Sequence, residues 1–295
     1  MSESDLLRVV DYHKHFHISR NFTVKAVDGI SFEVRSGEVF SLVGESGSGK
    51  STVAKGVMGI YPANKGEIYF KGHLISDRKS YKKARKHVQK DIQIVFQDSA
   101  AALNPRMKVK DIISEPLVVN KIFPSKGELI ERIDELMLQV GLDPLFKNKY
   151  PNEISGGQRQ RVAIARAIGL NPDLIVADEP VASLDVSIQA QIITLFEYLR
   201  EEKNFTFFFI AHDLALVRYI SDRVGVMYGG KIVEICPSEE LFKNPWHPYT
   251  RSLLSAIPVP DPIYEKQKPL IGFDKSKFNP NGAMTKVADD HYALA

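Results

Sequence analysis

The first hundred residues alternate between apolar runs and turn residues. "LLRVVDY" (6–12) and "VKAVDGISFEV" (24–34) are rich in Val, Ile and Phe with partial alternation, which predicts short strands separated by turns over residues 1 to about 40. "EVFSLVG" (38–44) predicts a buried strand that runs into a glycine-rich loop, with a helix from about Lys50 to Gly59. "GEIYFKGHLI" (66–75) predicts an antiparallel hairpin that turns at Lys71-Gly72, and "DIQIVFQD" (91–98) predicts a further strand.

The pattern then changes to a helical period. In "KGELIERIDELMLQVGL" (126–142) one face of a helix would carry six apolar residues, and Gly141 would end that helix. The six are Leu129, Ile130, Ile133, Leu136, Met137 and Val140. Because helical patterning persists to about Leu170, we expect an all-helical insertion over residues 98–170.

Strands return after this insertion. "DLIVADEP" (173–180) and "FTFFFIAHD" (205–213) predict buried strands separated by a helix, and "RVGVMYGGKIVEI" (223–235) predicts a hairpin on Gly229-Gly230. Strand–helix alternation of this kind indicates an α/β fold whose parallel sheet is covered on both faces. "AIPVPDP" (256–262) predicts a proline-rich boundary, followed by a polar, weakly patterned tail.

Composition limits the class of protein. The 295 residues are 44% hydrophobic and 25% charged, as in an ordinary globular protein, and the net charge of +3 is too small to indicate nucleic-acid binding. A single cysteine, Cys236, excludes disulfides within the chain and fits a reducing compartment. The apolar runs are too short to span a membrane, and the start of the chain lacks the pattern of a secretion signal.

The glycine-rich loop carries the clearest chemical motif. "GESGSGKS" fits G-x-x-x-x-G-K-[ST] and stands between an apolar strand and a helix, as a phosphate-binding loop requires. Its glycines let backbone N–H groups turn inward around phosphate oxygens, Lys50 would reach the terminal phosphates, and the Ser51 hydroxyl would ligate Mg²⁺. We therefore expect phosphate contacts along the loop from Gly44, Glu45, Ser46, Gly47, Ser48, Gly49, Lys50, Ser51 and Thr52.

A phosphate-binding loop needs a metal-holding carboxylate at the end of a neighbouring strand. "LIVADEP" supplies Asp178 for the metal and Glu179 as a general base for an attacking water. The alternative, a solvated acidic pair without a catalytic role, is less favoured because the same chain contains the phosphate-binding loop motif. His212 and Gln97 also close predicted strands, but each could equally be an ordinary polar residue at a strand end.

A second helix N-terminus that would suit an anion is predicted in "NEISGGQRQRVAIARA" (152–167). Ser155 and Gln158 predict a capping box, with Val162, Ile164, Ala165 and Ile168 as core positions. A capping box alone does not explain Gly156 and Gly157, because glycines weaken a helix start while leaving its N–H groups open to a ligand.

In this order, "GESGSGKST", Gln97, "ISGGQRQR", "LIVADE", "SLD" (183–185) and "AHD" (211–213) resemble the ATP-binding subunits of ABC transporters. The resemblance covers about residues 5–260. "VKAVDGISFEV", "QIVFQDSAAALNPRMKV" and "NPWHPYTRSLLSAIPVPDP" are similar to the oligopeptide and dipeptide importer branch, in particular to the subunit type that pairs with a non-identical ATP-binding partner.

The resemblance implies a P-loop NTPase with a RecA-like parallel sheet, an N-terminal antiparallel β subdomain and the helical insertion. The ATPase core would comprise residues 1–97 and 171–255, the helical signature subdomain residues 98–170, and the boundary and tail residues 256–295. ATP and Mg²⁺ would be the cofactors, and the importer would carry oligopeptides or dipeptides. Its other parts would be a second ATP-binding subunit, two membrane-spanning permease subunits and, indirectly, an extracytoplasmic solute-binding protein. The chain would act as a peripheral protein at the cytoplasmic face of the membrane, without nucleic acid.

The resemblance also assigns roles to single residues. Gln97 would contact Mg²⁺ and sense the γ-phosphate, and His212 would hold that phosphate and the attacking water. The signature residues Ser155, Gly156, Gly157 and Gln158 would meet the γ-phosphate of ATP bound to the partner, and Asp185 would contact the partner itself. Adenine would stack on an N-terminal aromatic ring, for which Phe16 is our candidate and Tyr12 the alternative.

The sequence departs from the family pattern in two places. Ile154 stands where leucine is commonest, a near-isosteric change. Residues 260–295 contain no cysteine, so the iron–sulfur cluster of some relatives cannot form there. Three alternatives stay open at this point: the same machinery importing oligosaccharides or nickel, a soluble ABC ATPase of DNA repair or translation, and a regulatory subunit without activity.

Overall fold

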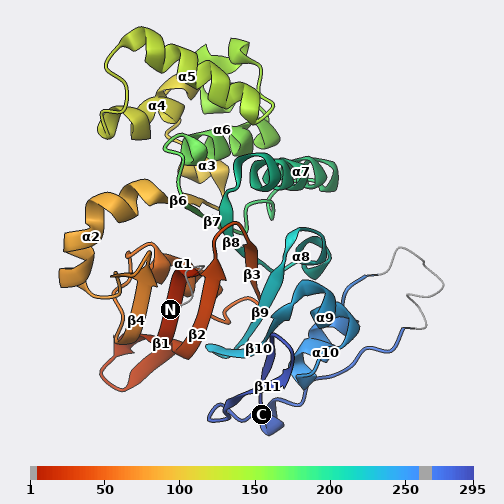
Figure 1. The fold of residues 1–295 in the computed structure, drawn as a ribbon. Helices are drawn as coiled ribbons and strands as arrows, with labels where there is room; N and C mark the ends of the chain where they lie inside the picture. Colours follow the sequence, from red (N-terminus) through yellow and green to blue (C-terminus); the bar gives the residue numbers. More distant parts are fainter. Residues whose placement is uncertain (1–4, 259–267) are drawn as a thin grey trace. The chain divides into compact units, whose positions relative to one another are not determined.

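The computed structural model describes residues 5–258 and 268–295, which form two compact units (Figure 1). The first unit comprises Met1–Ala84 and Phe208–Ala295, and the second comprises Arg85–Phe207. Residues 259–262 of the predicted proline-rich boundary lie outside the described residues.

The first unit contains most of the strands. Its elements are β1 (Asp5–Ser19), β2 (Phe22–Arg35), β3 (Val39–Val43), α1 (Lys50–Val57), β4 (Lys65–Phe70), β5 (His73–Leu74), α8 (Leu214–Ile220), β9 (Arg223–Tyr228), β10 (Lys231–Pro237), α9 (Ser238–Lys243), α10 (Pro248–Ser255), η3 (Lys275–Lys277), β11 (Met284–Ala288) and β12 (His291–Leu294). Helix α2 (Arg78–Asp91) and strand β8 (Thr206–Ala211) each cross a boundary between the units.

An antiparallel sheet of order β2-β1-β4-β5 forms the N-terminal part (Figure 1). The expectation of short strands was wrong here, because β1 and β2 are 15 and 14 residues long and pair along most of their length. Asp11 and Gly29, which look like strand breaks, have φ values of 44° and 78° and are accommodated by shifts of register within the ladder. The hairpin predicted at Lys71-Gly72 is confirmed, with positive φ at both residues.

In the second sheet, the strands that belong wholly or partly to this unit have the order β11-β12-β10-β9-β3-β8. Strand β3 pairs in parallel with β9, and every residue of β3 and β8 is buried, as predicted for both apolar runs. Phe32, Phe40 and Phe208 stack with ring centroids 5.2–6.2 Å apart. The hairpin predicted at Gly229-Gly230 joins β9 to β10, which places this turn next to the glycine-rich loop.

The C-terminal tail contains a hairpin that the sequence did not predict. Strand β12 pairs with β11 and also with β10, so the last residues extend the sheet. Glu234 of β10 is fully buried and lies 2.7 Å from His291 Nε2 of β12. Its two oxygens also accept hydrogen bonds from the backbone N–H groups of Trp246 and His247, so one carboxylate joins β10, β12 and the start of α10.

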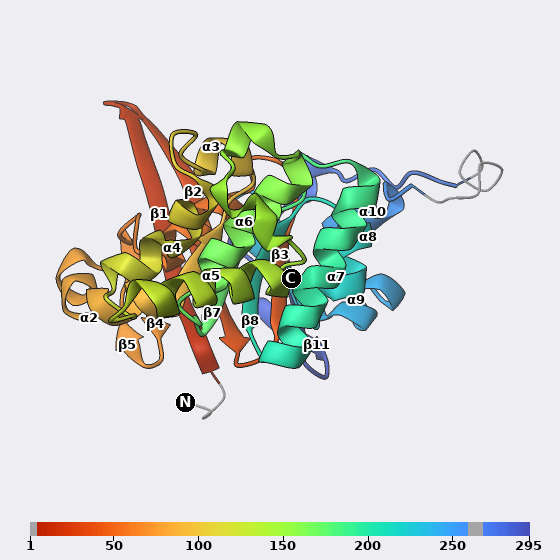
Figure 2. The same cartoon turned by 90° about the horizontal axis from the view of Figure 1, so that it is seen from above.

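The second unit contains most of the helices. Its elements are β6 (Ile92–Val95), α3 (Ser99–Ala102), α4 (Val109–Val119), α5 (Lys126–Gln139), η1 (Pro144–Asn148), η2 (Pro151–Glu153), α6 (Gly156–Ile168), β7 (Leu174–Asp178) and α7 (Val186–Lys203). Strands β6 and β7 pair in parallel. Helices α3, α4 and α5 all pack against α6 (Figure 2).

The predicted apolar face of α5 is correct in part. Ile133, Leu136 and Met137 are buried, and Gly141 ends the helix with a φ of 68°, as expected. Ile130, also predicted on this apolar face, is 49% exposed, so the face is not buried along its whole length. It lies in the first half of α5, where every described position before Ile133 is at least partly exposed.

Candidate active site

The glycine-rich loop follows β3 and is closely packed by its neighbours. Gly44 has a φ of 148° and Gly49 a φ of 110°. A Cβ atom on Gly44 would lie 2.1 Å from the Met227 carbonyl oxygen, and one on Gly49 would lie 2.1 Å from the Ala26 carbonyl oxygen. Glycine is therefore required at both positions, because any side chain would displace the loop.

The polar groups of the loop suit a phosphate. Lys50 is 4% exposed, and its Nζ donates to the carbonyl oxygens of Gly44 at 2.8 Å and Glu45 at 2.9 Å, so the ammonium lies within the loop. The buried Ser48 Oγ has no hydrogen-bond partner among the described residues. Helix α1 begins here without a side-chain cap or an acidic residue in its first turn. A buried cation, an unsatisfied hydroxyl and a helix N-terminus together fit a phosphate chain.

Residues far away in the sequence hold this loop, and no local sequence pattern predicts them. The Tyr249 hydroxyl, on α10, accepts a hydrogen bond from the Glu45 backbone N–H at 3.0 Å. The Gly230 N–H donates to the Ser48 carbonyl at 3.1 Å, and the Asp28 N–H donates to the Gly230 carbonyl at 2.9 Å. Tyr249 is 1% exposed, and burial raises its pKa to about 12, so its hydroxyl stays neutral.

The two aromatic candidates for adenine differ in exposure. Tyr12 is fully buried, and its hydroxyl packs so closely on α1 that a Cβ on Gly56 would lie 2.4 Å away. It offers no ring face to a base, so the alternative Tyr12 is excluded. Phe16 is partly exposed and meets Tyr61 edge to face at 5.2 Å, with Lys14 Nζ over both rings. Phe16 stays our prediction for the adenine contact.

The predicted acidic pair lies at the end of β7. Asp178 is the last residue of β7, and Glu179 has a φ of 49°, a left-handed conformation that is costly for a residue with a side chain. Because β6 and β7 are parallel neighbours, the residues that follow them emerge at the same edge of the sheet. Ser183 Oγ donates to the Gln97 carbonyl at 3.3 Å, so the segments after β6 and β7 are in contact.

The signature segment forms the predicted capping box. Ser155 Oγ accepts from the Gln158 N–H at 3.2 Å, and Gln158 Oε1 accepts from the Ser155 N–H at 2.9 Å. The four predicted core positions of α6 are buried: Val162, Ile164, Ala165 and Ile168. A cavity of about 380 Å³ adjoins this helix start, lined in part by Ser155, Gly157 and Gln158.

The structure gives one of the two signature glycines a packing role. A Cβ on Gly157 would lie 2.6 Å from Ile188 Cγ2 of α7, whereas one on Gly156 would meet its first neighbour at 3.6 Å. Close approach of α6 and α7 therefore explains Gly157 without a ligand, and only Gly156 still lacks a structural reason. A ligand contact at Gly156 stays a prediction.

Two further predicted residues lie at helix starts. Asp185 is the N-cap of α7, where its Oδ1 accepts from the Ile188 N–H at 3.1 Å and from Ser187 Oγ at 2.6 Å. The hydrogen bond from Ser187, with that from the Ile188 N–H, lowers the pKa of Asp185. His212 is exposed and follows β8 directly, before the N-cap of α8.

The predicted site residues divide between the two units. Phe16, residues 44–52 and His212 belong to the first unit, in which His212 follows β8, the strand next to β3. Gln97, Asp178, Glu179, the signature residues and Asp185 belong to the second unit. Their roles toward a nucleotide stay predictions.

Comparison with known proteins defines the class. The family model described as ABC transporter matches residues 27–182, and the model described as the C-terminal region of oligopeptide/dipeptide transporters matches residues 233–278. The chain belongs to the ABC transporter family and is an ATP-binding cassette ATPase of mixed α/β fold. The predicted fold class and family are confirmed.

The individual relatives reported next belong to the oligopeptide transport branch of this class. The oligopeptide transport ATP-binding protein OppF of Bacillus subtilis is 51% identical over 271 residues, which cover 92% of this chain and 88% of that protein. The OppF of Streptococcus mutans is 49% identical over 263 residues, which cover 89% and 85%.

Solved structures agree with this assignment. A dimeric post-hydrolysis ATP-binding cassette bound to ADP and Pi is 28% identical with a TM-score of 0.72, over 79% of this chain and 98% of that one. CbiO1 of Clostridium perfringens, part of an ABC transporter complex, is also 28% identical with a TM-score of 0.72, over 82% and 92%. None of the helices in the described part of our chain combines the length and apolar character needed to cross a bilayer.

Proposed function

We propose that this protein hydrolyses ATP to power the import of oligopeptides through membrane-spanning permease subunits. The observation that carries the proposal is the glycine-rich loop, in which a buried Lys50 and an unsatisfied Ser48 hydroxyl form a cradle for phosphate. The cargo is inferred from relatives named as oligopeptide transport ATP-binding proteins, one of them 51% identical over 92% of this chain.

Within one subunit, residues 44–52 bind the phosphates of ATP and Phe16 contacts its adenine. Ser51, Gln97 and Asp178 supply the hydroxyl, amide and carboxylate oxygens that Mg²⁺ prefers. When bound, Mg²⁺ neutralises charge that develops on the phosphates. Glu179 takes the proton from the attacking water, and His212 holds that water and the γ-phosphate in position.

The second half of each site comes from another subunit. Ser155, Gly156, Gly157 and Gln158 contact the γ-phosphate on the partner, and Asp185 contacts the partner's surface. Support comes from the relative solved as a dimeric cassette bound to ADP and Pi. ATP then joins the two subunits, and the loss of the bridging phosphate on hydrolysis lets them separate.

Membership in the ABC transporter family supports the proposed assembly. The partner is a second, non-identical ATP-binding subunit, and the pair binds two permease subunits at the cytoplasmic face of the membrane. An extracytoplasmic solute-binding protein delivers the cargo to the permease.

Uptake in cells tests the cargo. A chromosomal Lys50→Ala variant should stop the uptake of labelled oligopeptides, because the lysine that reaches the terminal phosphates of ATP is lost. The uptake of oligosaccharides and nickel should stay unchanged, because only this transporter is altered. Continued peptide uptake, with the variant protein present at its normal level, would refute the proposal. If oligosaccharide or nickel uptake is lost instead, the proposed cargo is wrong, but the proposed role as a transport ATPase stands.

A further inference from the structure

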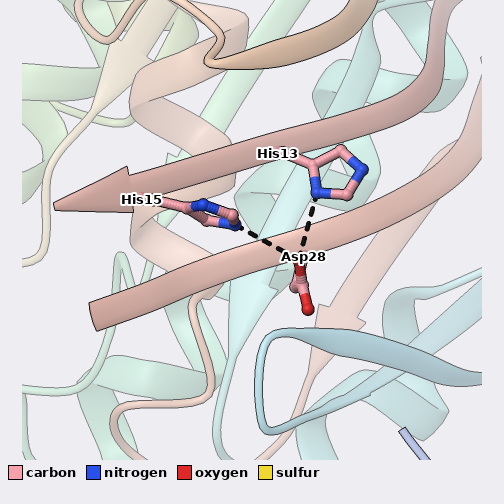
Figure 3. A group of neighbouring side chains, drawn as sticks. All are labelled: His13, His15 and Asp28. Carbon is pink, nitrogen blue, oxygen red and sulfur yellow. Dashed lines mark hydrogen bonds and ion pairs between the residues drawn. The ribbon is translucent and has the colours of Figure 1, made fainter. Parts of the chain in front are cut away.

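The N-terminal hairpin carries a cluster of side chains that ATP hydrolysis does not use. Strand β1 has histidines at alternate positions, and two of them, His13 and His15, meet Asp28 of β2 (Figure 3). His13 Nδ1 lies 3.1 Å and His15 Nε2 lies 3.2 Å from the same oxygen, Asp28 Oδ1. The three residues lie wholly within the first unit and are each partly buried.

We propose that His13 Nδ1, His15 Nε2 and Asp28 Oδ1 bind a divalent transition-metal ion of the zinc type. Two imidazole nitrogens and one carboxylate oxygen are a usual donor set for Zn²⁺. Donors bonded to Zn²⁺ at 2.0–2.2 Å in tetrahedral geometry are about 3.3–3.6 Å apart. The observed separations from Asp28 Oδ1 are slightly shorter, so the ion enters with a small outward movement of the side chains.

Neighbouring groups already orient the donors. His13 Nε2, the nitrogen that the ion leaves unused, lies 2.9 Å from Asp11 Oδ1. A carboxylate on the second nitrogen of a ligating histidine fixes its tautomer and ring orientation. Asp11 holds this position with a φ of 44°, and its backbone N–H donates to Ser31 Oγ.

The lysines near Asp28 limit the affinity. Lys25 Nζ lies 3.5 Å and Lys231 Nζ lies 3.8 Å from Asp28 Oδ2, the oxygen turned away from the histidines. They hold the carboxylate in place but also repel a divalent cation. Lys25 is 63% exposed, so removing its charge is a mild change that should strengthen binding.

A second group with metal-binding residue types, Glu234, Cys236 and His291, does not compete as a site. All three residues are buried, and both oxygens of Glu234 already accept hydrogen bonds. Burial raises the pKa of the Cys236 thiol, which opposes the thiolate that a metal needs. This group is a structural network of the C-terminal hairpin.

Titration of the full-length chain, prepared without a polyhistidine tag, with Zn²⁺ against a chromophoric chelator tests the site. We expect one equivalent to bind, and His15→Ala and Asp28→Asn each to weaken binding at least tenfold. His17→Ala is the matched control, since His17 lies on the same strand and bonds Thr23 instead. Cys236→Ala should also bind as the wild type, while Lys25→Gln should bind roughly 3- to 10-fold more tightly.

Circular dichroism and thermal melting check that every variant is folded. Because we expect Lys25→Gln to bind Zn²⁺ more tightly than the wild type, a general loss of structure cannot produce the expected set of affinities. The proposal is overturned if the wild type binds no stoichiometric Zn²⁺, if His15→Ala and Asp28→Asn bind like the wild type, or if Cys236→Ala removes the binding.

Discussion

The hydrogen bond between the Glu45 N–H and the Tyr249 hydroxyl can be removed without emptying the space around it. Tyr249→Phe keeps the ring, whose centroid lies 4.5 Å from that of Tyr228 and 5.3 Å from that of Phe273. Only the 3.0 Å contact to the loop is lost. A neutral hydrogen bond of this type contributes about 1 kcal/mol, which corresponds to roughly fivefold in an equilibrium constant.

We expect Tyr249→Phe to lower the free energy of unfolding by about 1 kcal/mol and, because ATP must then order a looser loop, to weaken binding of ATP by up to about fivefold. Titration with a fluorescent ATP analogue and denaturant unfolding measure the two quantities. Tyr228→Phe is the control, because it removes a hydroxyl from the same aromatic cluster but not the one that holds Glu45. If Tyr249→Phe binds the analogue within twofold of the wild type and unfolds at the same denaturant concentration, Tyr249 does not position the loop.

Three further predictions concern other parts of the molecule. Glu179→Gln should bind ATP normally but lose turnover at least about 100-fold and accumulate as a closed pair, which steady-state ATPase assays and gel filtration measure; near-normal turnover would exclude Glu179 as the base. Gly157→Ala places a Cβ 2.6 Å from Ile188 Cγ2 and should destabilise the protein by about 1–3 kcal/mol in denaturant unfolding, with recovery in Gly157→Ala/Ile188→Ala; equal loss in the single and double variants would contradict the packing role. Burial lowers the pKa of His247 below its ordinary 6.5 although Glu234 opposes this, so the unfolded chain binds the proton first and stability should fall as pH drops below about 6.5. His247→Asn, which can keep the cap on the Tyr249 N–H, should have a smaller loss of melting temperature between pH 7.5 and 5.5, and an unchanged loss would point to other groups.

Elements with a strong local signal were predictable from the sequence. The strand in "EVFSLVG" before the glycine-rich loop is predicted by its apolar residues, which are buried. The turn at 229–230 is predicted by its two glycines, which both adopt positive φ. The capping box of Ser155 and Gln158 is also a purely local motif, and it forms as expected.

Other parts depend on contacts that no local pattern encodes. Helix α2 was missed because its apolar face is narrow, with only Tyr81, Ala84 and Val88 among charged and polar residues. The C-terminal hairpin was missed because its few apolar residues follow a polar stretch. Tyr249 meets Glu45 across 204 residues of chain, and Gly157 needs its small size because of Ile188 on another helix. Only the folded chain shows which residues fill such roles.

The residues that hold the glycine-rich loop are synthesised long after the loop itself. The loop leaves the ribosome early, whereas Gly230 and Tyr249, which hold its backbone, follow about 180–200 residues later. At a usual elongation rate of 5–20 residues per second, this delay is roughly 10–40 s. The second unit is complete before these partners emerge, so it can fold while the first unit waits for the end of the chain. A nascent chain that stalls within α10 would therefore carry an intact loop sequence whose backbone lacks the Tyr249 contact.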